Sequence, residues 1–221
     1  METVSTQVGP YNLTVFRDDM WVSTTLRSGQ EWEGWMRSDL PWLVRPGEDI
    51  IDVGGNIGWN SLMFSEYSPV HVFEPVYHEI IQKNISQNNT KHPVTLHPYG
   101  LLDENSSFKF YFPGVSPGGL FNAAVTSIYK SNYCCDQFTT CPVKRLDDVY
   151  QGVPCLIKID VEGAELGVIK GAERIIRTHR PHLYVEIFDI EGPIPKLLKE
   201  WGYEHMLKRP EDNYLFVGHV P

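Results

Sequence analysis

From Asp49 onward the sequence alternates short apolar runs with amphipathic segments, and this alternation restricts the fold more than any other feature. Repeated β-α-β units place parallel strands in one sheet with helices on both faces. The chain therefore predicts an α/β fold that closes with an antiparallel hairpin over 203–207 and 213–219. Strands are predicted at 49–53, 70–75, 94–100, 106–113, 155–163 and 182–189, and helices at 59–67, 76–89, 164–179 and 193–202.

The first 45 residues lack this alternation and are predicted to form a cover over residues 46–221, which make up the main domain. Residues 1–30 show weak alternation typical of short strands or a hairpin. Residues 29–49 predict an amphipathic helix, interrupted near Pro41, that packs against the sheet. A polar stretch from Gly114 to Thr140 is predicted to be a binding loop, and its cysteines are expected to be reduced thiols.

The turn "DVGGNIG" at 52–58 lies between an apolar strand and a helix. A phosphate-binding P-loop needs Gly-Lys-Ser/Thr, but Trp59 follows the last glycine. A dinucleotide site needs glycine at the position of Asn56, and Asp52 would repel a pyrophosphate. The pattern favours a zwitterionic adenosine ligand without phosphate. Asp52 would meet its amine directly or through water, and backbone N–H groups would meet its carboxylate.

Glu74 lies twenty-two residues after Asp52, at the end of the next predicted strand. A carboxylate at this position can accept hydrogen bonds from both hydroxyls of a ribose. An adenosine with an amino-acid tail describes S-adenosylmethionine. A tight turn without any ligand and an NAD-dependent oxidoreductase are the alternatives, and calorimetric titration with both cofactors separates them.

Two predicted adjacent strand ends carry carboxylates that suit proton or metal chemistry. Lys158 and Asp160 are two residues apart on one strand and so share a face, and Glu186 ends the neighbouring strand. In one hypothesis Asp160, supported by Glu186, removes the proton of a hydroxyl acceptor. In the other, Asp160 and Glu186 hold a divalent ion such as Mg²⁺ that lowers the hydroxyl pKa. Glu162 and Glu165 fit a catalytic role and a helix N-terminus equally well.

Several motifs together make the sequence resemble the FkbM-like methyltransferases of the class I S-adenosylmethionine-dependent superfamily. They are "IIDVGGNIGWNSLMFS", "VFEP", "VTLHPYGLLDENSSFKFY", "VKRLDDV", "LIKIDVEGAELGVIKGAERII" and "RPHLYVEIFD", in this order over residues 48–190. The resemblance implies a Rossmann-like fold with a mostly parallel seven-stranded sheet. It also implies cofactor contacts, which fall at Asp52, Gly54, Asn56, Gly58 and Glu74, with Gly100 and Leu101 beside the adenine.

The same resemblance implies O-methylation, and the expected acceptor is a hydroxyl of a sugar or glycan. A hydroxylated natural product or other small molecule is the alternative, as is a module that binds the cofactor without catalysis. A net charge of −9 and a pI near 5.3 disfavour nucleic acids and anionic membranes as partners. The N-terminus lacks a signal-peptide pattern and no apolar run is long enough to span a bilayer, so a cytoplasmic protein is expected.

Overall fold

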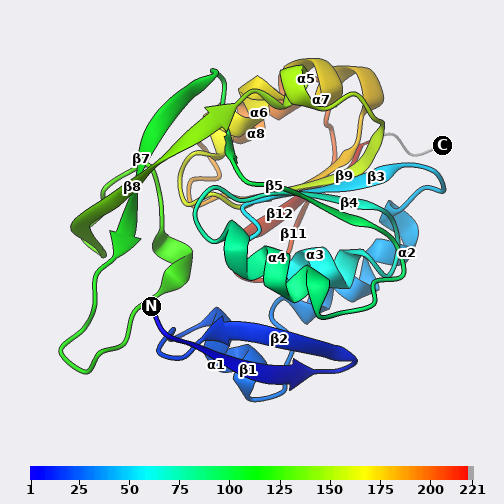
Figure 1. Ribbon diagram of the computed structural model, residues 1–221. Coiled ribbons are helices and arrows are strands. Elements are labelled where there is room, and N and C mark those ends of the chain that lie inside the picture. Colours follow the sequence, from blue (N-terminus) through cyan, green and yellow to red (C-terminus); the bar gives the residue numbers. More distant parts are fainter. Residues whose placement is uncertain (219–221) are drawn as a thin grey trace.

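A mixed seven-stranded sheet forms the centre of the protein, for which a computed structural model describes residues 1–218 (Figure 1). The strand order is β11-β12-β10-β9-β3-β4-β5. The strands are β3 (Asp49–Val53), β4 (Val70–Phe73), β5 (Val94–His97), β9 (Pro154–Ile159), β10 (His182–Glu186), β11 (Met206–Lys208) and β12 (Asn213–Phe216). The strands β3, β4, β5, β9 and β10 are parallel to one another, and β12 runs antiparallel to both of its neighbours, β10 and β11. The predicted sheet and its C-terminal hairpin are confirmed, with His219 outside the described residues.

Helices cover both faces of this sheet, as predicted (Figure 1). One face carries α2 (Leu40–Leu43), α3 (Trp59–Phe64) and α4 (His78–Ser86), and the other carries α5 (Leu146–Val149), α6 (Glu165–Gly171), α7 (Glu173–His179) and α8 (Pro193–Glu200). Every residue of β9 is buried. A strand enclosed on both faces reads as a continuous apolar run, which is why "CLIKI" was recognisable as a central strand.

The single helix predicted over 164–179 is wrong, because two helices, α6 and α7, meet at Ala172. Ala172 has φ −113° and ψ 13°, outside the helical region. A Cβ on Gly171 would lie 2.0 Å from the carbonyl oxygen of Leu102, so the chain here passes directly against another backbone. Apolar residues keep the helical spacing across the break, and the sequence pattern therefore conceals it.

The N-terminal cover contains the predicted hairpin and three short helices. The hairpin is β1 (Thr3–Val8) and β2 (Tyr11–Phe16). Residues 22–27 form α1 (Val22–Arg27), where a strand was expected. In place of the amphipathic helix over 29–49 there are a 3-10 helix, η1 (Gly34–Ser38), and α2, which begins next to Pro41. A left-handed Glu33 (φ 49°) precedes η1 and prevents a continuous helix.

One buried amide, that of Asn84 on α4, attaches the hairpin to the main domain. Its Oδ1 accepts the N–H of Thr14 at 2.7 Å, and its Nδ2 donates to the carbonyl oxygens of Thr14 at 3.0 Å and Ile57 at 2.8 Å. Ile57 belongs to the glycine turn. A single side chain thus joins the hairpin, α4 and the turn.

A second, three-stranded sheet projects to one side of the main sheet (Figure 1). It has the order β6-β8-β7, with β6 (Gly100–Leu101), β7 (Ser106–Pro113) and β8 (Cys134–Lys144). The polar stretch is therefore shorter than predicted, and it contains a 3-10 helix, η2 (Ala123–Val125). Cys134, Cys135 and Cys141 lie in a strand rather than a loop, as free thiols. Within residues 1–218, no helix is long and apolar enough to cross a bilayer.

Candidate active site

The glycine turn lies where the strand order of the sheet reverses, between β3 and β9. Gly54 has φ +85°, and a Cβ there would be 1.9 Å from the carbonyl oxygen of Asp160. No other residue fits this close approach without moving the loop after β9. Asn56 is also left-handed, with φ 50°, and its N–H donates to Glu74 Oε2 at 3.1 Å. In open α/β sheets this reversal point is where ligands bind.

A first cavity opens beside the turn and encloses about 740 Å³, including space open to solvent. Its wall is mainly apolar and comes from the ends of β3 and β4, from β6 and from β7. Five of the predicted cofactor residues line it: Gly54, Asn56, Glu74, Gly100 and Leu101.

Glu74 is the buried carboxylate of this cavity. Its Oε1 accepts the N–H groups of Val76 at 2.7 Å and Tyr77 at 3.1 Å, and its Oε2 accepts that of Asn56. Burial raises the pKa of Glu74, and these three backbone donors act in the opposite direction. The side chain is thereby fixed in one orientation at the cavity wall.

The other two predicted cofactor residues, Asp52 and Gly58, do not contribute to the described lining of either cavity. Asp52 is fully buried and its Oδ2 accepts a hydrogen bond from Ser61 Oγ at 2.5 Å. Burial raises the pKa of Asp52, while the neighbouring charge of Lys158 lowers it. Gly58 has φ +85° and begins α3, with Ile81 packed 3.2 Å from the position of a Cβ. Both residues therefore support the conformation of the turn from the side that faces α3 and α4, away from the cavities.

A second cavity lies on the other side of the turn and encloses about 1280 Å³, again including open solvent. Its wall combines the turn, the ends of β9 and β10, the N-terminal cover and β12. Five residues line both cavities: Gly54, Asn56, Ala124, Asp160 and Glu162. The two cavities therefore meet at the turn and at the carboxyl end of β9.

Lys158 and Asp160 form a salt bridge at this meeting point. The distance from Lys158 Nζ to Asp160 Oδ2 is 2.9 Å, and the lysine side chain is only 2% exposed. Burial alone would lower the pKa of Lys158, but the charges of Asp160, Glu33 and Asp52 raise it above its ordinary value. The lysine is thus a permanent cation among carboxylates. It is positioned to orient Asp160, and the two side chains point to the same side, as the spacing of two residues on one strand predicts.

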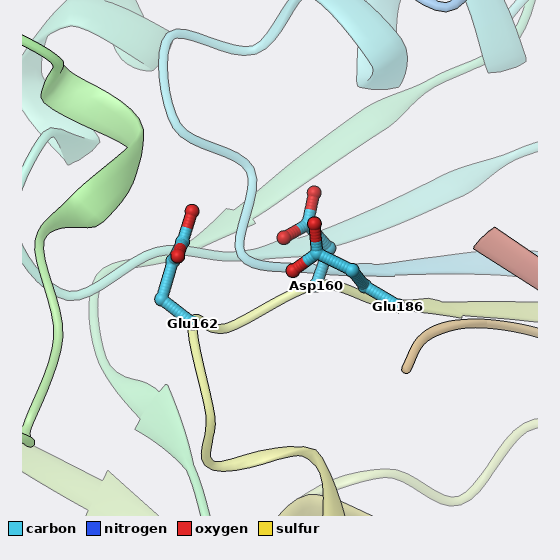
Figure 2. A group of neighbouring side chains, drawn as sticks. All are labelled: Asp160, Glu162 and Glu186. Carbon is cyan, nitrogen blue, oxygen red and sulfur yellow. The ribbon is translucent and has the colours of Figure 1, made fainter. Parts of the chain in front are cut away.

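Three carboxylates gather beside this ion pair: Asp160, Glu162 and Glu186 (Figure 2). Each offers an oxygen atom within 4.8 Å of the others. Burial raises the pKa of Glu186 to about 9, and the nearby charges of Asp160 and Glu162 contribute to the rise. Burial likewise raises the pKa of Glu162 to about 8, again with a contribution from Asp160. The group can hold protons or a cation.

The two glutamates left undecided by the sequence have different positions. Glu162 lines both cavities and has a left-handed backbone, with φ 56°. Glu165 begins α6, and its Oε1 accepts the N–H groups of Val161 at 3.2 Å and Gly163 at 2.9 Å. Glu165 is therefore an acidic residue in the first turn of α6 whose carboxylate holds the preceding loop, which fits the helix N-terminus interpretation, and Glu162 lines the site.

Sequence reasoning missed four polar residues of the second cavity: Glu33, Asn60, Glu211 and Asn213. They come from η1's N-terminal end, from α3 and from the C-terminal hairpin, and no local motif marks them. It also missed a histidine pair, since His71 and His97 lie 3.0 Å apart (Nδ1 to Nε2) on β4 and β5. Neither histidine is among the residues that line the described cavities.

The raised carboxyl pKa values predict that stability falls as pH rises from about 7 to about 9. In this interval an unfolded chain has ionised glutamates, but folded Glu186 and Glu162 keep protons until about pH 9 and 8. The native state then binds more protons, so the free energy of unfolding decreases with pH. Burial lowers the pKa values of His97 and His182 to about 4. These two histidines therefore lower the free energy of unfolding only as the pH falls below their ordinary pKa of 6.5, outside the interval from pH 7 to 9.

Urea unfolding at several pH values measures this dependence. Glu186→Gln should give a shallower decrease above pH 7, because the titrating group is gone. An identical slope in the wild type and this variant would show that Glu186 does not hold the proton.

Comparisons with known proteins identify the family of this chain. Residues 52–205 match the family described as methyltransferase FkbM domain. "Methyltransferase 1" of Beauveria bassiana (strain ARSEF 2860) is 29% identical over 189 residues, which cover 73% of this chain and 74% of that protein. "Methyltransferase sdnD" of Sordaria araneosa is 28% identical over 198 residues, which cover 73% and 76%.

Among solved structures, methyltransferase FkbM from Methylobacillus flagellatus KT is similar, with a TM-score of 0.52 and 21% sequence identity. The likeness covers 79% of this chain and 45% of that chain, and it confirms the class I methyltransferase fold. The family match extends over more than half of the sequence, from the glycine turn to the C-terminal hairpin. The protein therefore belongs to the FkbM methyltransferase family.

Proposed function

We propose that this methyltransferase transfers the methyl group of S-adenosylmethionine to a hydroxyl of a sugar or glycan. The observation that carries the proposal is the junction of two cavities at Gly54, Asn56 and Asp160. The first cavity would hold the cofactor and the second the acceptor. Methyl transfer from a sulfonium is an in-line displacement, so the two substrates must meet at one point. The sequence-based alternative of a hydroxylated natural product uses the same junction.

In the first cavity, Glu74 is the proposed partner of the ribose hydroxyls. The mainly apolar wall beside Gly100 and Leu101 suits an adenine ring. Gly54 and Asn56 bring the backbone of the turn to the amino-acid end of the cofactor. Asp52, which is enclosed behind the turn with Ser61, would support the turn or act through water rather than touch the ligand amine.

At the junction, Asp160 is the proposed proton acceptor for the hydroxyl. An aliphatic hydroxyl is a weak nucleophile until a base removes its proton as the new bond forms. Lys158 holds the Asp160 carboxylate by the 2.9 Å salt bridge and fixes its orientation. Glu186, the other half of the predicted pair, lies beside it, and because burial raises its pKa to about 9 it keeps its own proton at neutral pH and leaves Asp160 as the acceptor.

A divalent ion such as Mg²⁺ is the alternative means of activating the hydroxyl. Asp160, Glu162 and Glu186 offer carboxylate oxygens within 4.8 Å of one another, and oxygen is the ligand type that such an ion prefers. When bound, the ion would act as a Lewis acid on the acceptor oxygen. Turnover in excess EDTA separates the two possibilities: unchanged turnover eliminates the metal and leaves Asp160 as the base.

Glu74→Gln should weaken binding of S-adenosylhomocysteine by about 10- to 100-fold, because an amide cannot accept from both ribose hydroxyls while it also accepts the backbone N–H groups. Isothermal titration calorimetry measures the loss. Glu79→Gln on the exposed surface of α4 is the matched control and should leave the affinity unchanged. Equal affinity of both variants would remove Glu74 from the cofactor site.

Two measurements test the proposed function itself. Calorimetry with S-adenosylhomocysteine and with NAD⁺ should detect binding of the first compound and not of the second. Transfer of a radiolabelled methyl group to a panel of sugars and glycosides should then yield a labelled ether. Cofactor binding without transfer to any acceptor would favour a non-catalytic module, and absence of cofactor binding would refute the proposal.

A further inference from the structure

The second cavity has three tryptophans in its wall, and they differ in how much of each ring is accessible. The three are Trp21, Trp32 and Trp59. Trp59 is only 2% exposed, and its Nε1 donates a 2.7 Å hydrogen bond to the carbonyl oxygen of Trp32, which is itself partly buried. In contrast, 56% of Trp21 is exposed. Trp21 is therefore the one of the three that offers a large accessible ring surface at the cavity.

Trp21 also differs from the other exposed apolar side chains of the protein. Within residues 1–218, no other large apolar side chain on the surface lines either described cavity, and examples outside them are Trp42 and Phe188. A single exposed apolar residue is ordinary on a protein surface. One that shares a cavity with the proposed base, Asp160, is placed to meet a ligand, because small-molecule sites are lined mainly by apolar and aromatic side chains.

The backbone that carries Trp21 is attached to the polar loop between β7 and β8. The N–H of Met20 donates to the carbonyl oxygen of Phe121 at 2.8 Å, and the N–H of Phe121 donates to that of Asp18 at 3.1 Å. The two segments thus pair as a short parallel bridge. The same loop lines the second cavity with Asn122. The N-terminal cover and this loop therefore form one continuous part of the cavity wall.

The buried side chain of Asp19 fixes this attachment. Asp19 is 1% exposed, its Oδ1 accepts the N–H of Ala123 at 3.0 Å, and its Oδ2 accepts that of Ser23 at 2.7 Å. Its carbonyl oxygen accepts the hydroxyl of Thr24 at 2.6 Å. Trp21 lies between Asp19 and Ser23 in the chain, so its backbone is held in place before a ligand binds. A contact residue that is already positioned loses less conformational freedom on binding.

A rigid ring with an apolar face is the ligand feature that such an indole recognises. In a β-glucopyranoside the hydroxyl groups point outward around the ring, and axial C–H bonds project from its two faces. The face of an aromatic ring is negative and attracts these slightly positive C–H groups. Stacking also removes apolar surface of both partners from water. An open-chain polyol carries similar hydroxyl groups but has no rigid face to stack.

We propose that Trp21 is an acceptor-binding residue, whose indole stacks on the apolar face of a cyclic sugar and holds it in the second cavity. The inference rests on the proposed function, because it assigns the second cavity to the acceptor. It adds a requirement for the sugar ring itself, beyond the presence of a hydroxyl group. Trp21 precedes residues 52–205, so this requirement comes from a part of the chain outside the family match.

Two matched probes test this requirement on the wild-type protein: methyl β-glucoside and glucitol. Saturation-transfer NMR with S-adenosylhomocysteine present should show the glucoside binding at least about fivefold more tightly than glucitol. Equal affinities of the two probes, or no binding of the glucoside, would overturn the inference. Failure of the proposed function is recognised separately by calorimetry, as absent binding of S-adenosylhomocysteine.

Trp21→Ala tests the residue itself. Loss of the stacking face should weaken binding of methyl β-glucoside by about five- to thirtyfold and leave the affinity for S-adenosylhomocysteine unchanged. The side chain is exposed, and the carbonyl oxygen that accepts the N–H of Thr25 at 2.9 Å is kept, so the start of α1 should persist. Trp21→Phe retains an aromatic face and should keep most of the affinity for the glucoside.

Trp42→Ala is the matched control. Trp42 is a tryptophan of α2 with 47% exposure, and it lines neither cavity. Its replacement should leave the affinity for methyl β-glucoside at the wild-type value. Unchanged glucoside binding in Trp21→Ala, or an equal loss in Trp42→Ala, would exclude Trp21 as the stacking residue.

Discussion

Asp160→Asn should reduce kcat for methyl transfer by about 10²- to 10⁴-fold, the range expected when a general base is lost. The amide has nearly the same shape but cannot take the proton of the acceptor hydroxyl. Binding of S-adenosylhomocysteine should persist, since Asp160 approaches the glycine turn through its backbone carbonyl oxygen, which the substitution leaves in place. Single-turnover transfer of a radiolabelled methyl group measures the chemical step, and calorimetry measures cofactor binding.

The matched control for this substitution is Asp189→Asn. Asp189 is an exposed residue just after β10, where its Oδ1 accepts the N–H of Glu191 at 3.1 Å, and asparagine can do the same. This variant should turn over at the wild-type rate. If Asp160→Asn retained full turnover, neither the base nor the metal version of the chemistry would survive.

Lys158→Met should destabilise the folded protein by about 3–5 kcal/mol, because it leaves buried carboxylates without their cation. For a chain of this size that corresponds to a Tm lower by roughly 10 °C. The affected groups are Asp160, Asp52 and Glu33, whose charges all act on the lysine. The last two are almost completely buried, so they cannot turn to solvent for compensation.

The pH dependence of this loss identifies its cause. Protonation neutralises the carboxylates, so the difference from the wild type should be larger at pH 8 than at pH 5. Thermal unfolding monitored by circular dichroism at both pH values measures it. Lys170→Met, an exposed lysine on α6, is the control and should be close to neutral. A loss independent of pH would point to packing rather than to unpaired charge.

The turn and the strand end beside the first cavity were predictable because their sequence signals are local. The turn 52–58 and the strand end at Glu74 lie in consecutive β-α units, and such units place their strands side by side. The loop geometry that requires Gly54 is likewise encoded within a few residues. Gly100 and Leu101 follow from the family resemblance rather than from local spacing, and the histidine contact between β4 and β5 was not predicted.

The polar residues of the second cavity could not be predicted in the same way. Glu33, Asn60 and Asn213 are brought together only by the folded chain, and none belongs to a motif of fixed spacing. The helical spacing of apolar residues also gives a wrong helix prediction where a tertiary contact overrides the local preference for helix. The helix break at Ala172 is set by close packing of Gly171 against Leu102, and a single glycine within a continuous apolar helical pattern did not reveal it.

Asn84 has a consequence for how the protein opens. Its side-chain amide forms hydrogen bonds with two residues that are far apart in the sequence, Thr14 of the hairpin and Ile57 of the glycine turn. If the hairpin detached, the buried amide would lose its two hydrogen bonds to Thr14 and would hold the turn through Ile57 with a less constrained side chain. Fluctuations of the hairpin and of the glycine turn are therefore linked through Asn84. A ligand that binds the turn and reduces its mobility should also reduce the mobility of the hairpin, which the ligand does not contact.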